Sequence, residues 1–224
     1  MTDSDTDEVQ PIRVLLIDDD PLVCSGLELI LSSTDDIRVV GTAGDGDEAV
    51  AAVQRHYPDV VLLDVRMARL DGIAATEALC ALPSPPRVIV LTTFDADDIV
   101  MRAIGAGAAG FLLKTAPAGE IIKAIRNVHA GDGALSPRSA RRVFKQVGGA
   151  GAARATARAA VDGLSDRERD VVRLVGEGLS NQQIGAQLYV GEATVKTHLA
   201  SAQRKLGVEG RVRLAVLAAR AGLI

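Results

Sequence analysis

Tryptophan is absent from the 224-residue sequence, and aromatic residues make up only 2% of it. A core must therefore be built from aliphatic side chains, which the hydrophobic content of 48% can supply. Apolar runs of about 18 residues are also missing, so no transmembrane helix and no membrane partner are expected. Residues 1–10 are acidic and polar and lack the basic and apolar regions of a signal peptide. These absences predict a cytoplasmic protein with a disordered tail over residues 1–11.

Cysteine is scarce as well. Cys24 and Cys80 are the only two, and both fall within apolar helical patterns. Two such thiols are expected to be free, in a reducing compartment. No group of cysteine and histidine residues has the spacing of zinc ligands, so the sequence offers no candidate zinc site.

The net charge of −4 is distributed unevenly along the chain. Residues 1–131 carry a net charge of −11, residues 132–162 carry +4 and residues 163–224 carry +3. This asymmetry indicates that the C-terminal part meets an anionic partner, whereas the acidic N-terminal part would not favour non-specific DNA binding.

Within residues 12–131, five short apolar runs alternate with helical patterns. The runs are unbroken and bounded by polar residues, which is typical of a parallel sheet with both faces covered. We therefore predict a doubly wound (βα)5 α/β domain of the flavodoxin-like type. Its predicted strands are Ile12–Ile17, Val39–Thr42, Val60–Leu63, Val88–Leu91 and Gly110–Leu113, and its predicted helices are Pro21–Leu31, Gly46–Arg55, Asp71–Leu82, Asp97–Ala106 and Gly119–Ala130.

Polar side chains follow four of these strands directly. Asp18 and Asp19 follow the first, Asp64 the third, Thr92 the fourth and Lys114 the fifth. The carboxyl ends of parallel strands line one crevice, so three carboxylates, a hydroxyl and an ammonium group should converge there. Oxygen ligands of this kind suit Mg²⁺, and a carboxylate can act as a nucleophile toward phosphorus. The pattern predicts a magnesium and phosphoryl site, with Asp64 as acceptor, Lys114 as counter-ion and Thr92 as hydroxyl donor.

Five strings surround these residues: Leu16-Ile17-Asp18-Asp19, Leu63-Asp64-Val65-Arg66-Met67, Leu70-Asp71-Gly72, Val90-Leu91-Thr92-Thr93-Phe94 and Gly110-Phe111-Leu112-Leu113-Lys114. Through these strings, residues 12–131 resemble the receiver domain of bacterial response regulators. That resemblance implies that a sensor histidine kinase phosphorylates Asp64. It also implies that Asp19, Asp64 and the backbone carbonyl of Arg66 bind Mg²⁺ directly, while Asp18 acts through water.

By the same resemblance, Thr92 moves toward the phosphoryl group and Phe111 changes rotamer in step. Two positions depart from the usual pattern of the family. Ala68 stands where a proline usually follows the methionine, which is expected to loosen the loop after Asp64. Thr115 stands where a proline often follows the lysine. Neither departure touches the acceptor or the expected metal ligands.

Residues 132–162 are expected to form a linker, because glycine clusters interrupt the pattern. Pro137–Gln146 could form a short helix, and Ala150–Ala160 either a partial helix or a mobile linker. Residues 163–224 are predicted to form an all-α, four-helix domain. Ser165 and Glu168 form a capping-box pattern for a helix to about Glu177, and the remaining predicted helices are Asn181–Leu188, Glu192–Leu206 and Arg211–Ala221.

Residues 181–206 form a helix-turn-helix pattern, because a three-residue turn separates the two predicted helices. In such a motif the second helix enters the DNA major groove. A purely structural four-helix module would show the same helices. Polar donors on the second helix favour DNA, since they could reach phosphates and base edges: Thr194, Lys196, Thr197, His198, Ser201, Gln203, Arg204 and Lys205.

This domain resembles the LuxR-type DNA-binding domain, through the strings Leu164-Ser165-Asp166-Arg167-Glu168, Gly178-Leu179-Ser180-Asn181, Thr194-Val195-Lys196-Thr197-His198 and Lys205-Leu206-Gly207-Val208. A receiver joined to this domain is typical of the NarL/FixJ class. The resemblance makes Lys196 and Thr197 candidates for base contacts. It makes Thr194, His198 and Arg204 candidates for phosphate or packing positions.

The expected function is a DNA-binding response regulator of a two-component system. Its expected partners are a sensor histidine kinase, double-stranded DNA and RNA polymerase, and the last helix would pair two copies in a phosphorylated homodimer. The only expected catalysis is self-phosphorylation and slow self-dephosphorylation of Asp64. An aspartate-based phosphatase would need a second acid/base aspartate at position 66, where the chain has arginine. A relic receiver that no longer takes a phosphoryl group would not need the complete set of polar residues at the strand ends.

Overall fold

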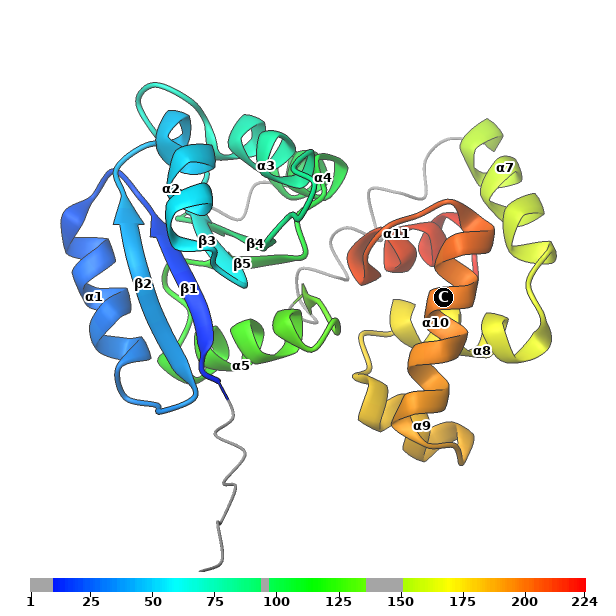
Figure 1. The fold of residues 1–224 in the computed structure, drawn as a ribbon. Coiled ribbons are helices and arrows are strands. Elements are labelled where there is room, and N and C mark those ends of the chain that lie inside the picture. The colour runs from blue at the N-terminus through cyan, green and yellow to red at the C-terminus, as the bar shows by residue number, and fades with distance from the viewer. Residues whose placement is uncertain (1–9, 94–96, 136–150) are drawn as a thin grey trace, which may run out of the picture.

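The computed structural model describes residues 10–93, 97–135 and 151–224 (Figure 1). The predicted helix at Pro137–Gln146 and nearly all of the predicted tail lie outside these residues. An α/β part comes first along the chain and a helical part follows it.

The α/β part is built on a parallel sheet with the strand order β2-β1-β3-β4-β5-β6. This order confirms the doubly wound fold, because the chain moves outward from β1 in both directions. The sixth strand is a short addition that pairs with β5. The strands are β1 (Ile12–Ile17), β2 (Ile37–Ala43), β3 (Val60–Asp64), β4 (Arg87–Thr92), β5 (Gly110–Leu113) and β6 (Ala134–Leu135).

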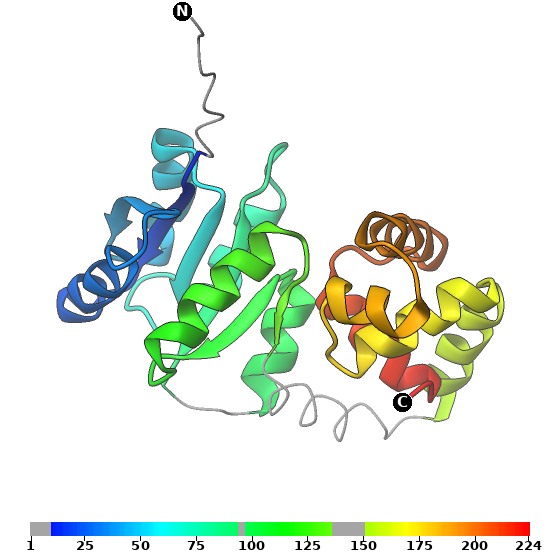
Figure 2. The same ribbon diagram turned by 90° about the horizontal axis from the view of Figure 1, so that it is seen from below.

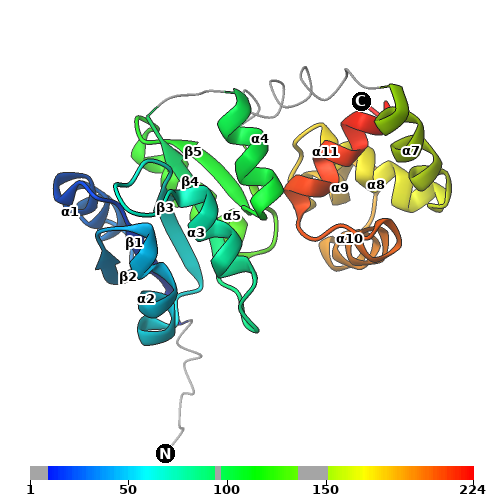
Figure 3. The ribbon, with the colours of Figure 1, turned by 90° about the horizontal axis from the view of Figure 1, so that it is seen from above.

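Helices cover both faces of the sheet, as the unbroken apolar strands predicted. On one face, α1 (Pro21–Leu31) and α5 (Ala118–His129) pack on alternate residues of the strands, and Figure 2 shows α5 crossing that face. The other face carries α2 (Ala49–His56), α3 (Gly72–Cys80) and α4 (Asp97–Ala106), which Figure 3 shows from above. Among the described residues, both cores are aliphatic apart from the ring of Phe111 and the thiol of Cys24.

Strand register brings the predicted site residues to one edge of the sheet. Ile17 pairs with Leu63, Asp64 with Leu91, and Thr92 with Leu113. The next residue along each of β1 and β5 therefore emerges at the same level as the carboxyl end of β3.

The helical part contains α7 (Gly151–Asp162), α8 (Asp166–Gly176), α9 (Asn181–Leu188), α10 (Glu192–Leu206) and α11 (Arg211–Ala221). Ser165 forms the predicted capping box with Glu168, and Ser180 forms another with Gln183. The turn between α9 and α10 passes through Tyr189, whose φ of 57° is left-handed. The bounds of α9, α10 and α11 agree with the prediction, because their caps are local.

Some predicted elements differ at their ends. Gly46–Glu48 is a 3₁₀ turn (η1) that precedes α2, whereas the prediction started an α-helix there. Asp71 is the N-cap of α3 and accepts hydrogen bonds from the N–H groups of Ile73 and Ala74. Two stretches of the predicted linker are ordered: residues 134–135 extend the sheet, and α7 packs Ala157 and Val161 into the core of the helical part.

Candidate functional site

Three of the predicted site residues meet at the carboxyl edge of the sheet. The Lys114 ammonium lies 2.6 Å from the carboxylate of Asp18 and 3.1 Å from that of Asp64. The Asp64 carboxylate also accepts a hydrogen bond from the N–H of Val65 at 2.8 Å, and that of Asp18 accepts one from the N–H of Asp20 at 3.0 Å. The predicted convergence of acceptor and counter-ion is therefore present in the fold.

Burial strengthens the electrostatic interactions among Asp18, Asp64 and Lys114. Asp18 and Asp64 are each 4% exposed, and Asp19 beside them is exposed. Burial raises the pKa of Asp64, and the adjacent Lys114 ammonium opposes that rise. Burial alone would lower the pKa of Lys114, but its contacts with Asp18 and Asp64 outweigh burial and raise it. Lys114 thus partly neutralises two carboxylates that would otherwise repel each other.

The same carboxylates fit a divalent cation. Asp18, Asp19 and Asp64 each offer an oxygen atom, and these three oxygens lie within 4.8 Å of one another. An all-oxygen donor set with one exposed member suits Mg²⁺, which retains several waters when bound. Arg66, whose carbonyl was predicted as a further ligand, lies in the exposed loop directly after β3.

The two predicted switch residues lie on neighbouring strands. Thr92 is 1% exposed at the end of β4, and its carbonyl accepts a hydrogen bond from the N–H of Lys114 at 2.7 Å. Phe111 is also 1% exposed and belongs to the core shared with Val100 and Ile104 of α4. The Phe111 ring is already inside the core in this structure. The predicted rotamer change of Phe111 would require a second conformation of the protein, and it stays a prediction.

The second candidate site is the surface of α10. Thr194, Lys196, Thr197 and Arg204 are exposed, and His198 is half-buried. Lys196 forms an ion pair with Glu192 at 3.1 Å. The Thr197 hydroxyl donates to the Ala193 carbonyl at 3.0 Å. The predicted polar helix surface is therefore present, although none of these contacts tests DNA binding.

Lys205, predicted for DNA, has a structural partner that the sequence did not reveal. Its ammonium lies 2.7 Å from the Glu168 carboxylate, which also accepts a hydrogen bond from the Ser201 hydroxyl at 2.7 Å. Glu168 is 4% exposed, and these contacts, with that of Lys205 first, lower its pKa to about 2. Glu168 therefore links α10 to the start of α8.

One side of α10 faces the α/β part across a cavity of about 210 Å³. Lys196, Ala200 and Gln203 of α10 line this cavity. The opposite wall includes Arg87 and residues around the end of α5. A candidate base-reading residue therefore lines the space between the two parts.

The two parts also contact each other directly through α11 and α4, which lie side by side in Figure 3. The guanidinium of Arg213 donates to the carbonyl of Ile104 at 3.1 Å and to that of Gly105 at 2.6 Å. These carbonyls belong to the last turn of α4, where acceptors lack partners in the regular helix. That of Ile104 also accepts a hydrogen bond from the N–H of Gly107 at 3.1 Å. Val212 and Val216 of α11 pack into the same core cluster as α4.

A second contact between the parts involves a buried ion pair. Arg211 lies 3.6 Å from Asp132, and its guanidinium also donates to the side chain of Asn181 at 2.8 Å and to the carbonyl of Leu179. Burial lowers the pKa of Arg211 and raises that of Asp132, and the attraction between the two opposes both shifts. Sequence reasoning missed Arg211, Arg213 and Asp132, because no local pattern marks a contact between distant segments.

Two family models match the two parts of the chain. The model of the response regulator receiver domain matches residues 14–126. The model of the bacterial regulatory proteins of the luxR family matches residues 162–218. No helix among the described residues is both long enough and apolar enough to cross a membrane.

Individual relatives match nearly the whole chain. The transcriptional regulatory protein LiaR of Bacillus subtilis is 40% identical over 213 residues, which is 95% of this chain and 99% of LiaR. The probable transcriptional regulatory protein NarL of Mycobacterium tuberculosis is 38% identical over 216 residues, covering 96% of this chain and 97% of that protein. The crystal structure of the response regulator ChrA, from a heme-sensing two-component system, aligns with a TM-score of 0.52 at 38% identity. It covers 96% of this chain and 99% of ChrA.

Proposed function

Because the chain belongs to the response regulators that join a receiver domain to a LuxR-type DNA-binding domain, we propose that Asp64 accepts a phosphoryl group and thereby controls DNA binding. The observation that carries this proposal is the buried contact of Lys114 with both Asp18 and Asp64. The family consists of transcriptional regulators and not of classical enzymes. Self-phosphorylation and slow self-dephosphorylation of Asp64 are the only catalysis proposed.

In the proposed transfer, a carboxylate oxygen of Asp64 bonds to phosphorus as the P–N bond of a phosphohistidine on the sensor kinase breaks. The imidazole keeps the electron pair of that bond, and hydrolysis by water later releases inorganic phosphate from Asp64. Lys114 is placed to stabilise charge on the phosphoryl oxygens, and the Thr92 hydroxyl is proposed to approach them.

Mg²⁺ would be held by Asp19, Asp64 and the carbonyl of Arg66, with Asp18 acting through water, and it would neutralise charge on the phosphoryl group. The donor oxygens of the three carboxylates support this assignment, since they lie within 4.8 Å of one another. Asp18 and Asp19 keep the negative charge that the site needs for the cation once Lys114 shifts toward the phosphoryl oxygens.

The C-terminal residues 163–224 are proposed to bind double-stranded DNA through α10. Lys196 and Thr197 would reach base edges, and Thr194, His198, Arg204 and Lys205 would contact phosphates or support the helix. The partners proposed are a sensor histidine kinase, an operator, RNA polymerase and a second copy of the phosphorylated chain, all in the cytoplasm. Residues 12–131 form the proposed receiver, and residues 132–162 the proposed linker.

The arrangement of the two parts supports a closed resting state. Lys196 lines the cavity against the receiver, and Val212 and Val216 of α11 are buried on the α4 side. Phosphorylation adds no contact to DNA, so it must act by shifting the population of domain arrangements. The proposed relay runs from Thr92 and Phe111 to α4, and it would free α10 for DNA and α11 for pairing.

Intact-protein mass measurement tests the acceptor. After treatment with acetyl phosphate and Mg²⁺, the protein should gain one phosphoryl group, and the Asp64→Asn variant should gain none while keeping its circular dichroism spectrum. An adduct of normal yield in that variant would refute Asp64 as the acceptor.

Sedimentation and small-angle scattering test the switch. Beryllofluoride with Mg²⁺ mimics the phosphoryl group and should produce a more extended or dimeric protein with higher affinity for its DNA. If mass, shape and DNA affinity all stay the same while Asp64 is modified, the proposed coupling does not exist.

A further inference from the structure

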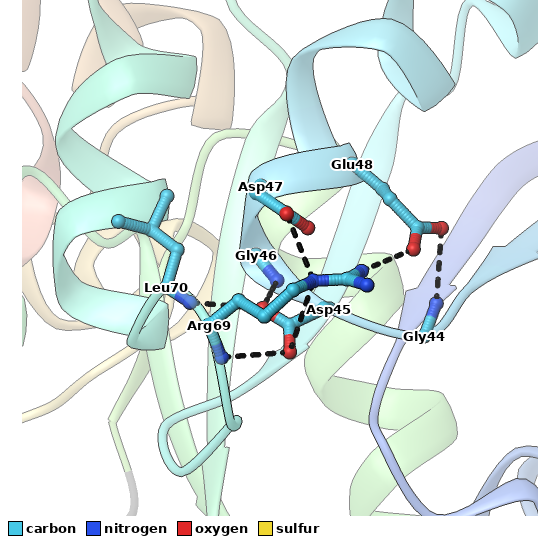
Figure 4. A network of polar contacts seen from close by, with 7 residues as sticks. All are labelled: Gly44, Asp45, Gly46, Asp47, Glu48, Arg69 and Leu70. Atoms are coloured by element: carbon cyan, nitrogen blue, oxygen red, sulfur yellow. Dashed lines mark hydrogen bonds and ion pairs between the residues drawn. The ribbon is translucent and has the colours of Figure 1, made fainter.

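A buried carboxylate outside the acidic site holds the loop that follows the acceptor. This loop, residues 65–70, joins β3 to α3. The carboxylate of Asp45, which follows β2, accepts hydrogen bonds from the N–H of Arg69 at 3.0 Å and from that of Leu70 at 2.9 Å (Figure 4). It also accepts one from the N–H of Gly46 at 2.8 Å. Asp45 is therefore a single anchor for two consecutive backbone groups of the loop.

The burial of Asp45 separates it from its acidic neighbours. Asp45 is 3% exposed, whereas Asp47 and Glu48 are exposed. Burial alone would raise the pKa of Asp45, but the three N–H donors outweigh it and the pKa lies below its usual range. The carboxylate is thus charged and bound mainly by backbone donors, which are strong partners for an ionised acceptor.

The side chain of Arg69 adds a second, weaker connection. Its guanidinium lies 2.8 Å from Asp47, 2.5 Å from Glu48 and 3.8 Å from Asp45, and Figure 4 draws these pairs. The Arg69 side chain is 56% exposed, so water screens these pairs and they contribute little to the position of the loop. The backbone contacts of Asp45 and the side-chain contacts of Arg69 can therefore be tested separately.

Glycines permit the close approach of the loop at both ends. A Cβ on Gly46 would lie 2.4 Å from the carbonyl oxygen of Leu70, and one on Gly72 would lie 1.9 Å from that of Asp64. The N–H of Gly72 also donates to the carbonyl of Val65 at 2.9 Å. The hydrogen bond between Gly72 and Val65 therefore joins the two ends of the loop, and Asp45 holds residues 69 and 70.

Arg66, whose carbonyl is proposed to bind Mg²⁺, lies between these two fixed points. A carbonyl ligand has no side-chain rotamer to adjust, so its direction depends on the path of the backbone. Ala68 does not restrict that path as a residue with a fixed φ would. The restraint must come from contacts of the loop. Val65 at its start is fixed by its hydrogen bond to the carbonyl of Leu91, and the buried carboxylate of Asp45 holds its other end.

We propose that Asp45 is a positioning residue for the divalent cation: by anchoring residues 69 and 70, it holds the carbonyl of Arg66 toward the carboxylates of Asp19 and Asp64. This inference rests on the proposed magnesium site. It assigns to Asp45 a role in cation affinity and no contact with the phosphoryl group.

The test compares the full-length protein with its Asp45→Ala variant by titration calorimetry with Mg²⁺. The dissociation constant should rise on the order of tenfold, as for other groups that orient metal ligands. Hydrogen exchange at the amides of Arg69 and Leu70 should accelerate. At saturating Mg²⁺ the rate of phosphorylation by acetyl phosphate should return to the wild-type value, because Asp45 does not contact the reacting atoms.

Arg69→Ala is the control for the side-chain contacts, because it keeps the backbone N–H that Asp45 binds. It removes the ion pairs of the guanidinium with Asp47 and Glu48 and the longer one with Asp45. Its Mg²⁺ affinity should stay within about twofold of the wild type. Should Asp45→Ala fail to fold, Asp45→Asn replaces it, since the amide oxygen retains one acceptor, and an intermediate loss of affinity is expected.

An unchanged Mg²⁺ affinity in a folded Asp45 variant overturns the positioning role, and so does a lowered phosphorylation rate that Mg²⁺ cannot restore. These results differ from a failure of the proposed function itself. In that case the wild-type protein would bind no Mg²⁺ or would take no phosphoryl group on Asp64.

Discussion

The ammonium of Lys114 lies closer to Asp18, at 2.6 Å, than to the proposed acceptor Asp64, at 3.1 Å. Its side chain is 12% exposed, so the pairs are poorly screened by water. Lys114 thus neutralises the two carboxylates in this structure, and its proposed role toward a phosphoryl group would compete with that neutralisation.

Replacing Lys114 with alanine should separate these functions. Without the ammonium, the three carboxylates should bind Mg²⁺ more tightly, on the order of tenfold, because a repelling charge is gone. Phosphorylation should slow on the order of 100-fold, because one charge that stabilises the transferring group is lost. Titration calorimetry and intact-protein mass kinetics measure the two effects. Lys114→Arg keeps the charge and serves as the control, and weaker Mg²⁺ binding by Lys114→Ala would contradict the assignment.

The DNA-binding role of α10 can be tested at Lys196, which is exposed and paired only with the neighbouring Glu192 among the contacts seen here. In the presence of beryllofluoride and Mg²⁺, Lys196→Ala should weaken operator binding by about 1–3 kcal/mol if the side chain reads a base. A phosphate contact would instead weaken all sequences alike and flatten the salt dependence. Gel-shift titrations at two salt concentrations distinguish these roles, with Arg220→Ala as a control that removes one charge elsewhere. Binding equal to that of the wild type would exclude both roles.

The contact between α11 and α4 should restrain the unphosphorylated protein. Arg213→Ala removes two hydrogen bonds to the last turn of α4, each made by a charged donor. The closed arrangement should lose population, and the affinity of the unphosphorylated protein for DNA should rise on the order of tenfold, or about 1.4 kcal/mol. Scattering should show a larger radius of gyration. A compact variant with wild-type affinity would show that Arg213 does not restrain the domains.

The Glu168 contacts predict a specific pH dependence of stability. The folded-state pKa of about 2 lies below the ordinary value of 4.5, so the ionised form stabilises the folded domain above about pH 4.5. That stabilisation should be lost as the pH falls from about 4.5 toward 2. Glu168→Gln should therefore cost about 1–3 kcal/mol at pH 7, and the difference in unfolding free energy from the wild type should shrink as the pH falls from about 4.5 toward 2. Urea unfolding across this range measures the gap, and a gap that stays constant would argue against an ionised Glu168 network.

Local signals in the sequence determined most of the fold. Unbroken apolar runs identified the core strands, because a residue buried on both faces of a parallel sheet must be apolar wherever it points. The positions of Asp18, Asp64, Thr92 and Lys114 followed from the same pattern, since each comes directly after a strand. Helices α9 to α11 were bounded correctly, because capping serines and glycines act within a few residues of the helix end.

Tertiary structure alone decided which distant residues meet. Asp45 is 25 residues from Leu70, Glu168 is 37 from Lys205, and Arg213 is 108 from Gly105. Each of these polar groups reads as an ordinary surface residue or cap in the sequence, because its partner is chosen by the packing of separate elements and not by local spacing. The acidic site could be predicted from the sequence because a parallel sheet brings the carboxyl ends of its strands together by a general rule. The contacts of Asp45 with the loop and of Arg213 with α4 could not, because they depend on how this protein packs its elements.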